Sequence, residues 1–138
     1  MSRRAFEIAV IALALSLGRA EAQNSPPSRS VWDSTYTAAQ ATKGETAFRY
    51  SCANCHALAQ FSGPSFLGAW EGGSAQELFH LIREEMPFDN PGTLPREQYV
   101  DILAYLFKLN GFPAGSRPLP GEPLELKQIR IQSKPEAK

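Results

Sequence analysis

The feature that most constrains this chain is a pair of cysteines followed directly by a histidine. Cys52 and Cys55 are the only two cysteines among the 138 residues, and His56 comes next. The spacing C-x-x-C-H is the attachment signature of c-type haem: each thiol adds to a vinyl group, and the adjacent imidazole lies under the iron. The sequence therefore predicts one covalently bound haem, held by Cys52 and Cys55, with His56 as an axial ligand of the iron.

Three other kinds of site use cysteines at this spacing. A redox-active C-x-x-C lies between a strand and a helix of a βαβ unit, and no strand pattern flanks Cys52. A structural zinc site needs four ligands, while His56 and His80 are the only histidines. A disulfide, common in exported chains, leaves His56 without a role. The five-residue motif alone leaves these alternatives open, so its surroundings decide between them.

Three segments have the pattern expected of helices. The first runs from about Thr35 to the cysteine pair. The second begins at Ser74, because Glu77 stands three residues later in a capping-box pattern, and it ends before Pro87. The third covers residues 95–110, where a proline opens the helix and an Asn-Gly pair ends it. The third segment carries a wide apolar face formed by Tyr99, Val100, Ile102, Leu103, Tyr105, Leu106 and Phe107.

Gly44 lies inside the first predicted helix, where a glycine costs about 1 kcal/mol relative to alanine. Such a glycine is useful where a second helix has to approach the backbone closely. Phe48 is four residues further along and therefore shares the same face of the helix. We expect a second helix to pack against this face, and the apolar helix at 95–110 is the candidate.

A haem bound by His56 has a second axial position. Met86 is the only methionine after residue 1, and it stands where the helix that begins at Ser74 ends in a proline-containing loop. Core packing is the commoner role of methionine. A thioether ligand, however, favours ferrous iron and raises the reduction potential, as suits an electron carrier. His80, in the same helix, is the rival ligand and would give a lower potential; water or an open position are further alternatives.

Residues 1–22 have the pattern of a cleavable signal peptide. Arg3 and Arg4 precede an apolar stretch, and the Ala-Glu-Ala sequence at 20–22 fits the small-x-small rule before a cleavage site. The alternative is a membrane anchor, but the uninterrupted apolar stretch at 8–15 is far shorter than the ~20 residues of a span. The sequence thus predicts export to the periplasm, with no stable membrane span after cleavage.

Charge and domain boundaries follow from this cleavage. It takes three arginines and two glutamates from the 14 basic and 14 acidic residues, which leaves 11 and 12 and a formal charge of −1. Such a surface provides no strong field for steering, and without a lysine–arginine cluster it excludes nucleic acid as a partner. We expect a flexible lead-in over 23–34, the helical domain over 35–118 and a tail over 119–138. The tail is either a strand-like strap or disordered.

Over roughly residues 35–115 these features together resemble class I cytochromes c. The similarity rests on Gly44, Phe48, the C-x-x-C-H motif, Gly63-Pro64, Met86-Pro87 and the segment 101–106. The resemblance implies an all-α fold of three to five helices around one haem, with the N- and C-terminal helices crossing at Gly44. It implies that the Pro64 carbonyl accepts the imidazole N–H of His56 and that Met86 is the second iron ligand. The implied contact between the crossing helices includes Phe48, Ile102 and Tyr105.

The implied function is transfer of single electrons, without catalysis by the chain itself. A narrower resemblance, to the cytochrome domain of PQQ-dependent alcohol dehydrogenases (quinohaemoproteins), rests on residues 38–41, 66–68, 86–87, 91–92, 104–106 and 110–115. It implies redox proteins as partners, with such a dehydrogenase as the electron donor and a terminal oxidase or another cytochrome as the acceptor. The alternative function is a haem protein with an open distal site, peroxidase-like or gas-sensing.

Overall fold

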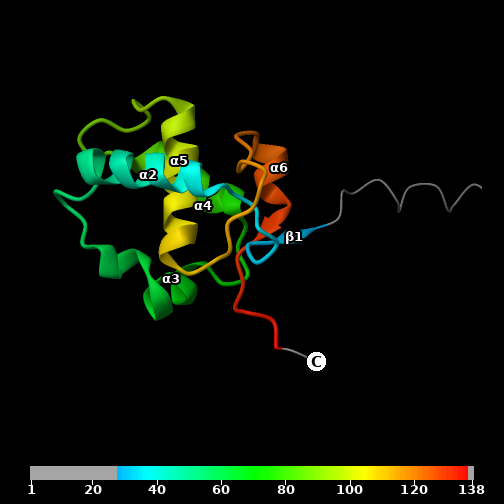
Figure 1. Ribbon diagram of the computed structural model, residues 1–138. Helices are drawn as coiled ribbons and strands as arrows, with labels where there is room; N and C mark the ends of the chain where they lie inside the picture. The colour runs from blue at the N-terminus through cyan, green and yellow to red at the C-terminus, as the bar shows by residue number, and fades with distance from the viewer. Residues whose placement is uncertain (1–27, 137–138) are drawn as a thin grey trace, which may run out of the picture.

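Side-chain caps set the beginnings of two long helices. The computed structural model of the chain describes residues 28–136 (Figure 1). In chain order, its elements are β1 (Arg29–Ser30), α2 (Ala38–Ser51), the 3-10 helix η2 (Leu58–Phe61), α3 (Gly63–Trp70), α4 (Ala75–Glu85), α5 (Arg96–Leu109), α6 (Pro123–Lys127) and β2 (Ile129–Arg130). The Thr37 hydroxyl accepts the N–H of Gln40 at the start of α2, and Ser74 and Glu77 form the predicted capping box before α4. The three predicted helices are confirmed.

The crossing of α2 and α5 depends on Gly44. In Figure 1, α2 (cyan) runs across α5 (yellow). A Cβ atom built on Gly44 would lie 1.7 Å from the carbonyl oxygen of Asp101 and 2.9 Å from the amide nitrogen of Ile102. The backbones therefore touch at a distance that only glycine permits. Phe48 and Tyr105 pack beside this point, with ring centroids 5.6 Å apart, so the predicted contact between the two helices is confirmed.

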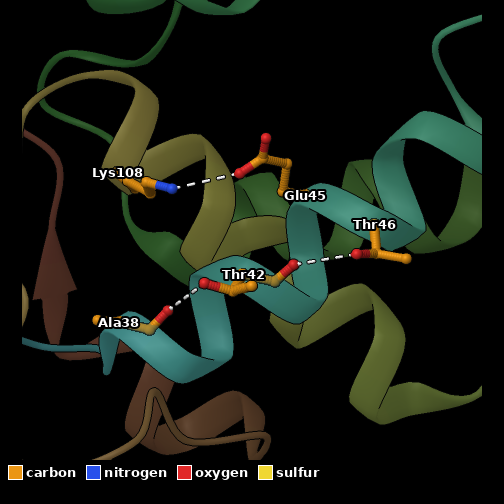
Figure 2. Close-up of polar contacts among 5 residues, drawn as sticks. All are labelled: Ala38, Thr42, Glu45, Thr46 and Lys108. Carbon is orange, nitrogen blue, oxygen red and sulfur yellow. Dashed lines mark hydrogen bonds and ion pairs between the residues drawn. The ribbon is translucent and has the colours of Figure 1, made fainter.

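The solvent-facing side of this crossing carries polar contacts that add little stability. Lys108 on α5 approaches Glu45 on α2, with 3.2 Å between Nζ and Oε2 (Figure 2). Both side chains are about half exposed, so water and salt screen the pair. The hydroxyls of Thr42 and Thr46 donate to the carbonyls of Ala38 and Thr42, and these bonds stay within α2. Backbone contact and apolar packing, rather than the ion pair, hold the crossing.

The core is centred on α5, because its apolar face is as wide as predicted. Its buried residues are Tyr99, Val100, Ile102, Leu103, Ala104, Tyr105, Leu106 and Phe107. α2, α4 and the chain ends cover this helix, and residues 28–136 form the all-α class I cytochrome c fold that was predicted, with five α-helices. None of the helices in residues 28–136 has the length and hydropathy of a membrane span. The predicted signal peptide, 1–22, lies outside the described residues.

The two ends of the described chain pack together, which corrects one predicted boundary. β1 and β2 pair in parallel, with Arg29 opposite Ile129. The indole N–H of Trp32 donates to the carbonyl of Gln132 at 2.9 Å. Residues 29–34 were predicted as part of a flexible lead-in, yet Val31 within them is fully buried. The packed unit therefore begins before residue 35, and residues 23–27 of the lead-in lie outside the described residues.

The C-terminal segment 119–131 is a strap on the domain, one of the two alternatives left open by its sequence. Its four buried apolar side chains are Leu119, Leu126, Ile129 and Ile131. Ile131 donates its N–H to the Gly73 carbonyl at 2.9 Å, and the Gly72 N–H donates to the Ile131 carbonyl at 2.8 Å. These bonds fasten the strap to the turn before α4. The domain core thus extends beyond residue 118.

Two leucines of α6 test whether the strap stabilises the domain. Leu126 is fully buried, whereas Leu124, two positions earlier, is 78% exposed. We expect Leu126→Ala to lower the free energy of unfolding by about 2–4 kcal/mol, because it removes buried apolar volume and leaves a cavity. The matched variant Leu124→Ala should change it by less than about 0.5 kcal/mol. Denaturant unfolding of the haem-loaded proteins measures both, and equal values for the two variants would contradict a packed strap.

Candidate functional site

Four of the predicted site residues meet at one cavity of about 630 Å³: Cys52, Cys55, His56 and Met86 all line it. The cysteines and the histidine follow the end of α2, and Met86 follows the end of α4. The inner wall is apolar and comprises Phe48, Phe61, Trp70, Leu78, Ile82, Ile102 and Leu106. The fold therefore brings the attachment motif and the predicted second ligand, 30 residues apart in sequence, to the same hollow.

A turn of backbone hydrogen bonds fixes the cysteine motif at the end of α2. The Cys52 N–H donates to the Phe48 carbonyl at 2.8 Å, and the His56 N–H donates to the Cys52 carbonyl at 3.0 Å. Both thiols are free; that of Cys52 is half-buried and that of Cys55 is exposed. Burial raises the pKa of the Cys52 thiol. Two unpaired thiols one turn apart are the arrangement that covalent attachment to two vinyl groups requires.

The imidazole of His56 is oriented by two neighbours. Its Nδ1 atom lies 3.3 Å from Oε1 of Gln60, which also accepts the N–H of Ala57 at 3.1 Å. The ring packs edge-on against Phe61, with centroids 5.1 Å apart. Because an amide oxygen only accepts, the contact favours the tautomer with the proton on Nδ1. Nε2 is then the unprotonated nitrogen and the atom available to a metal.

This contact differs from the one that the family resemblance implied. Pro64 was expected to offer its carbonyl to His56, but it lies exposed in the first turn of α3 and does not line the cavity. The acceptor beside Nδ1 is Gln60 instead, because the 3-10 helix η2 turns its side chain back toward the motif. A role for Pro64 at the haem stays a prediction. The sequence signal for Gln60 was its position four residues after the histidine.

Removing this acceptor should raise the reduction potential. In Gln60→Leu the side chain keeps its approximate size but accepts no hydrogen bond, so the imidazole becomes a weaker donor and ferric iron is less stabilised. We expect an increase on the order of 20–50 mV. Spectroelectrochemical titration measures it, with Gln98→Leu, an exposed position on α5, as the control. Equal potentials in the wild type and Gln60→Leu would show that Gln60 does not act on the imidazole.

Met86 is the C-cap residue of α4 and is half-buried at the cavity wall. Its N–H donates to the Ile82 carbonyl at 3.0 Å, and its carbonyl accepts the hydroxyl of Tyr99 at 2.7 Å. From the sequence, Tyr99 was assigned only to the apolar face of α5. Its polar role was missed because nothing in the local pattern relates residue 99 to residue 86.

The rival ligand His80 does not line this cavity. It is exposed on α4 and borders a different hollow of about 500 Å³, together with Glu77 and Glu84. Within residues 28–136, no three His, Cys, Asp or Glu side chains are grouped so that they could hold a metal ion. The zinc alternative for the two cysteines therefore has no ligand set in the described part of the chain. Iron ligation by Met86 stays the prediction for the second axial position.

Asn110, the C-cap residue of α5, secures the His56 side of the cavity. Its side-chain amide donates to the carbonyl of Phe61 at 2.8 Å, and its Oδ1 accepts the N–H of Gly63 at 2.9 Å. These two bonds attach the junction of η2 and α3 to the core helix. Phe61 in turn packs against both His56 and Phe48. The orientation of the imidazole is thus linked to the most buried helix of the fold.

Residues 39–106 match the family model described as cytochrome C oxidase, cbb3-type, subunit III. The matched range includes every residue that lines the cavity. This chain carries a class I c-type cytochrome domain. No curated protein and no solved structure matches the chain significantly. The cytochrome domain binds haem c, and its family transfers electrons through redox protein partners.

The cavity of the cytochrome domain fits a covalent haem. Free thiols stand at its rim, the contact of His56 Nδ1 with Gln60 favours the tautomer that leaves Nε2 available to a metal, and the inner wall offers apolar contact to a flat, largely apolar ring. When bound, haem supplies one-electron exchange between ferric and ferrous iron. Cys52 and Cys55 would hold it covalently, and His56 would bind the iron. Phe48, Leu106 and the other apolar side chains of the wall exclude water, which disfavours the extra positive charge of the ferric state.

Proposed function

We propose that this chain is a periplasmic mono-haem cytochrome that accepts single electrons from a PQQ-dependent dehydrogenase and passes them to a terminal oxidase or another cytochrome. The observation that carries the proposal is the cavity where Cys52, Cys55, His56 and Met86 meet. His56 and Met86 would supply the two protein ligands of the haem iron, an imidazole nitrogen and a thioether sulfur. A six-coordinate iron exchanges electrons without binding substrate.

The ionisable groups around the cavity favour a carrier over a haem enzyme. A peroxidase-like site needs a distal histidine or arginine as its acid–base group. Among the described residues, the ionisable side chains that line the cavity are Tyr50, Cys52, Cys55, His56 and Asp89. Three of these belong to the attachment motif. His80 and Arg83, the histidine and arginine of α4, do not line the cavity, so an open-site enzyme is the weaker alternative.

Support for the donor comes from the narrower sequence resemblance and from the surface beside the cavity. Tyr50 and Phe88 are 80% and 86% exposed, and both line its edge. Exposed aromatic side chains suit the small, transient interfaces, below ~1,200 Å², that redox proteins use. The description of the matching family names an oxidase subunit. This agrees with an oxidase as the acceptor of electrons from this cytochrome.

The proposal has a stoichiometric test. Oxidation of the reduced quinone cofactor releases two electrons and two protons, so each alcohol oxidised to aldehyde should reduce two molecules of this cytochrome. The oxidised, haem-loaded protein is mixed in a stopped-flow instrument with a PQQ-dependent alcohol dehydrogenase and ethanol, with ethanol omitted as the control. A ratio of two supports the proposal. Reduction by dithionite but not by the dehydrogenase contradicts the donor, and rapid cyanide binding to the ferric protein contradicts the closed carrier site.

A further inference from the structure

The segment between α4 and α5 forms one wall of the cavity and has few links to the rest of the domain. We call residues 87–94, which directly follow Met86, the distal loop. Most of its side chains are exposed, and that of Phe88 is 86% exposed. Two of its hydrogen bonds lie within it: Asn90 N–H to the Pro87 carbonyl, and the Thr93 hydroxyl to the Asn90 carbonyl. Internal bonds of this kind shape the loop but do not fix it to the core.

One side chain of α5 contacts both Met86, just before the distal loop, and Leu94, the last residue of the loop. The Tyr99 hydroxyl donates to the Met86 carbonyl at 2.7 Å and accepts the N–H of Leu94 at 3.4 Å. Within residues 28–136, no other side chain from outside the loop hydrogen-bonds to residues 86–94. The ring of Tyr99 is only 1% exposed and belongs to the core face of α5. A rigid, buried anchor thus holds a largely exposed loop.

We infer that Tyr99 is a positioning residue for Met86: its hydroxyl fixes the Met86 main chain, and through it the thioether, at the cavity wall. The inference rests on the proposed ligation of iron by Met86. The reason is mechanical. α4 ends at Glu85, so no helical hydrogen bond restrains the Met86 carbonyl. Among residues 28–136, the one other donor to that carbonyl is the N–H of Gly92, at 3.3 Å, which itself belongs to the distal loop.

The domain supplies a matched control for this hydroxyl. Tyr36 is 2% exposed, and its hydroxyl donates to the Phe112 carbonyl at 2.7 Å, the same length as the Tyr99 bond. Tyr36 does not line the cavity. Tyr36→Phe and Tyr99→Phe each remove a hydroxyl that donates to a backbone carbonyl at 2.7 Å, and each leaves the ring in place. A general loss of stability should be similar in both variants, whereas an effect on Met86 should occur only in Tyr99→Phe.

Imidazole, which competes with a weakly held axial ligand, is the probe. The ferric, haem-loaded wild type, Tyr99→Phe and Tyr36→Phe are titrated with imidazole while the weak sulfur-to-iron absorption band is followed. Tyr99→Phe loses the hydrogen bond that holds the main chain of Met86 at the cavity wall. Because Met86 is then displaced more easily, apparent imidazole binding should tighten about 3- to 10-fold in this variant. Tyr36→Phe should bind imidazole as the wild type does. Thermal unfolding of the same samples compares the global stability of the two variants.

The outcomes separate this inference from the proposed function. If the wild type shows the sulfur-to-iron band and Tyr99→Phe binds imidazole no more tightly than Tyr36→Phe, the positioning role is overturned while the carrier proposal stands. A wild type that holds covalent haem but lacks the band contradicts ligation by Met86, and the positioning role with it. Tighter imidazole binding in both variants would show a general loosening of the domain and would also overturn the role of Tyr99.

Discussion

Replacing Met86 by alanine lowers the reduction potential of the haem-loaded protein and removes the sulfur-to-iron band of its ferric spectrum. We expect a decrease on the order of 100 mV or more, since axial ligands alone move haem potentials over about 0.8 V. The thioether is a neutral, soft donor that stabilises ferrous iron relative to ferric. Without it, water or hydroxide enters from the exposed edge of the cavity and stabilises the ferric state.

Two further variants make the Met86 result specific. Met86→His supplies a stronger nitrogen donor, so its potential should also be lower than that of the wild type. Leu81→Ala changes another residue that lines the same cavity but has no donor atom, so its potential should stay near that of the wild type. Spectroelectrochemical titration of all four proteins gives the comparison. An unchanged potential in Met86→Ala would rule out Met86 as the ligand and reopen the question of the second axial position.

The second large effect concerns folding. We expect Gly44→Ala to lower the free energy of unfolding by about 4 kcal/mol or more, beyond the usual 1–3 kcal/mol of an overpacked core. The added Cβ would sit 1.7 Å from the carbonyl oxygen of Asp101, and a backbone atom cannot turn aside as a side chain can. α2 and α5 would have to separate, and Phe48 and Tyr105 would lose their contact.

Gly68 is the control for this substitution. It also lies inside a helix, α3, but a Cβ built on it meets no atom within 4 Å. Because alanine is the better helix former, Gly68→Ala should be neutral or stabilising by up to about 1 kcal/mol. Denaturant unfolding of haem-loaded wild type and variants measures the difference. Similar stability changes in Gly44→Ala and Gly68→Ala would mean that the helices do not meet at Gly44.

The parts of the fold that were predictable from sequence are those with local signals. The side chains of Ser74 and Glu77 form the capping box that starts α4. Gly44, a glycine inside a helix, indicates a close crossing with a second helix. The cysteine motif likewise contains its chemistry within five residues. Such signals, together with the class I resemblance that relates the helices to one another, led to four of the residues that line the cavity: Cys52, Cys55, His56 and Met86.

The parts that were not predictable depend on pairings across long stretches of chain. The strand-like part of the strap, next to Ile129 and Ile131, pairs with β1. That strand lies 100 residues earlier in the sequence, so the alternation of the two isoleucines alone does not reveal the pairing. Tyr99 was expected to pack, and its hydroxyl finds the Met86 carbonyl only in three dimensions. At His56, the resemblance implied the carbonyl of Pro64, whose role stays a prediction, and the contact of Nδ1 with the side chain of Gln60 was not foreseen. In each instance a hydrogen bond joins two groups whose pairing no periodic sequence pattern specifies.

The pairing of β1 with β2 has a consequence for the order in which the chain acquires its structure. Ribosomes make proteins from the N-terminus, so residues 129–132 appear only after α2 to α6 have been made. Until then, Val31 cannot be enclosed, and Trp32 lacks the carbonyl acceptor at Gln132. Closing a loop of this length also carries a large entropic barrier. The nascent domain therefore stays incompletely closed until residues 129–132 are available to pack against β1 and Trp32.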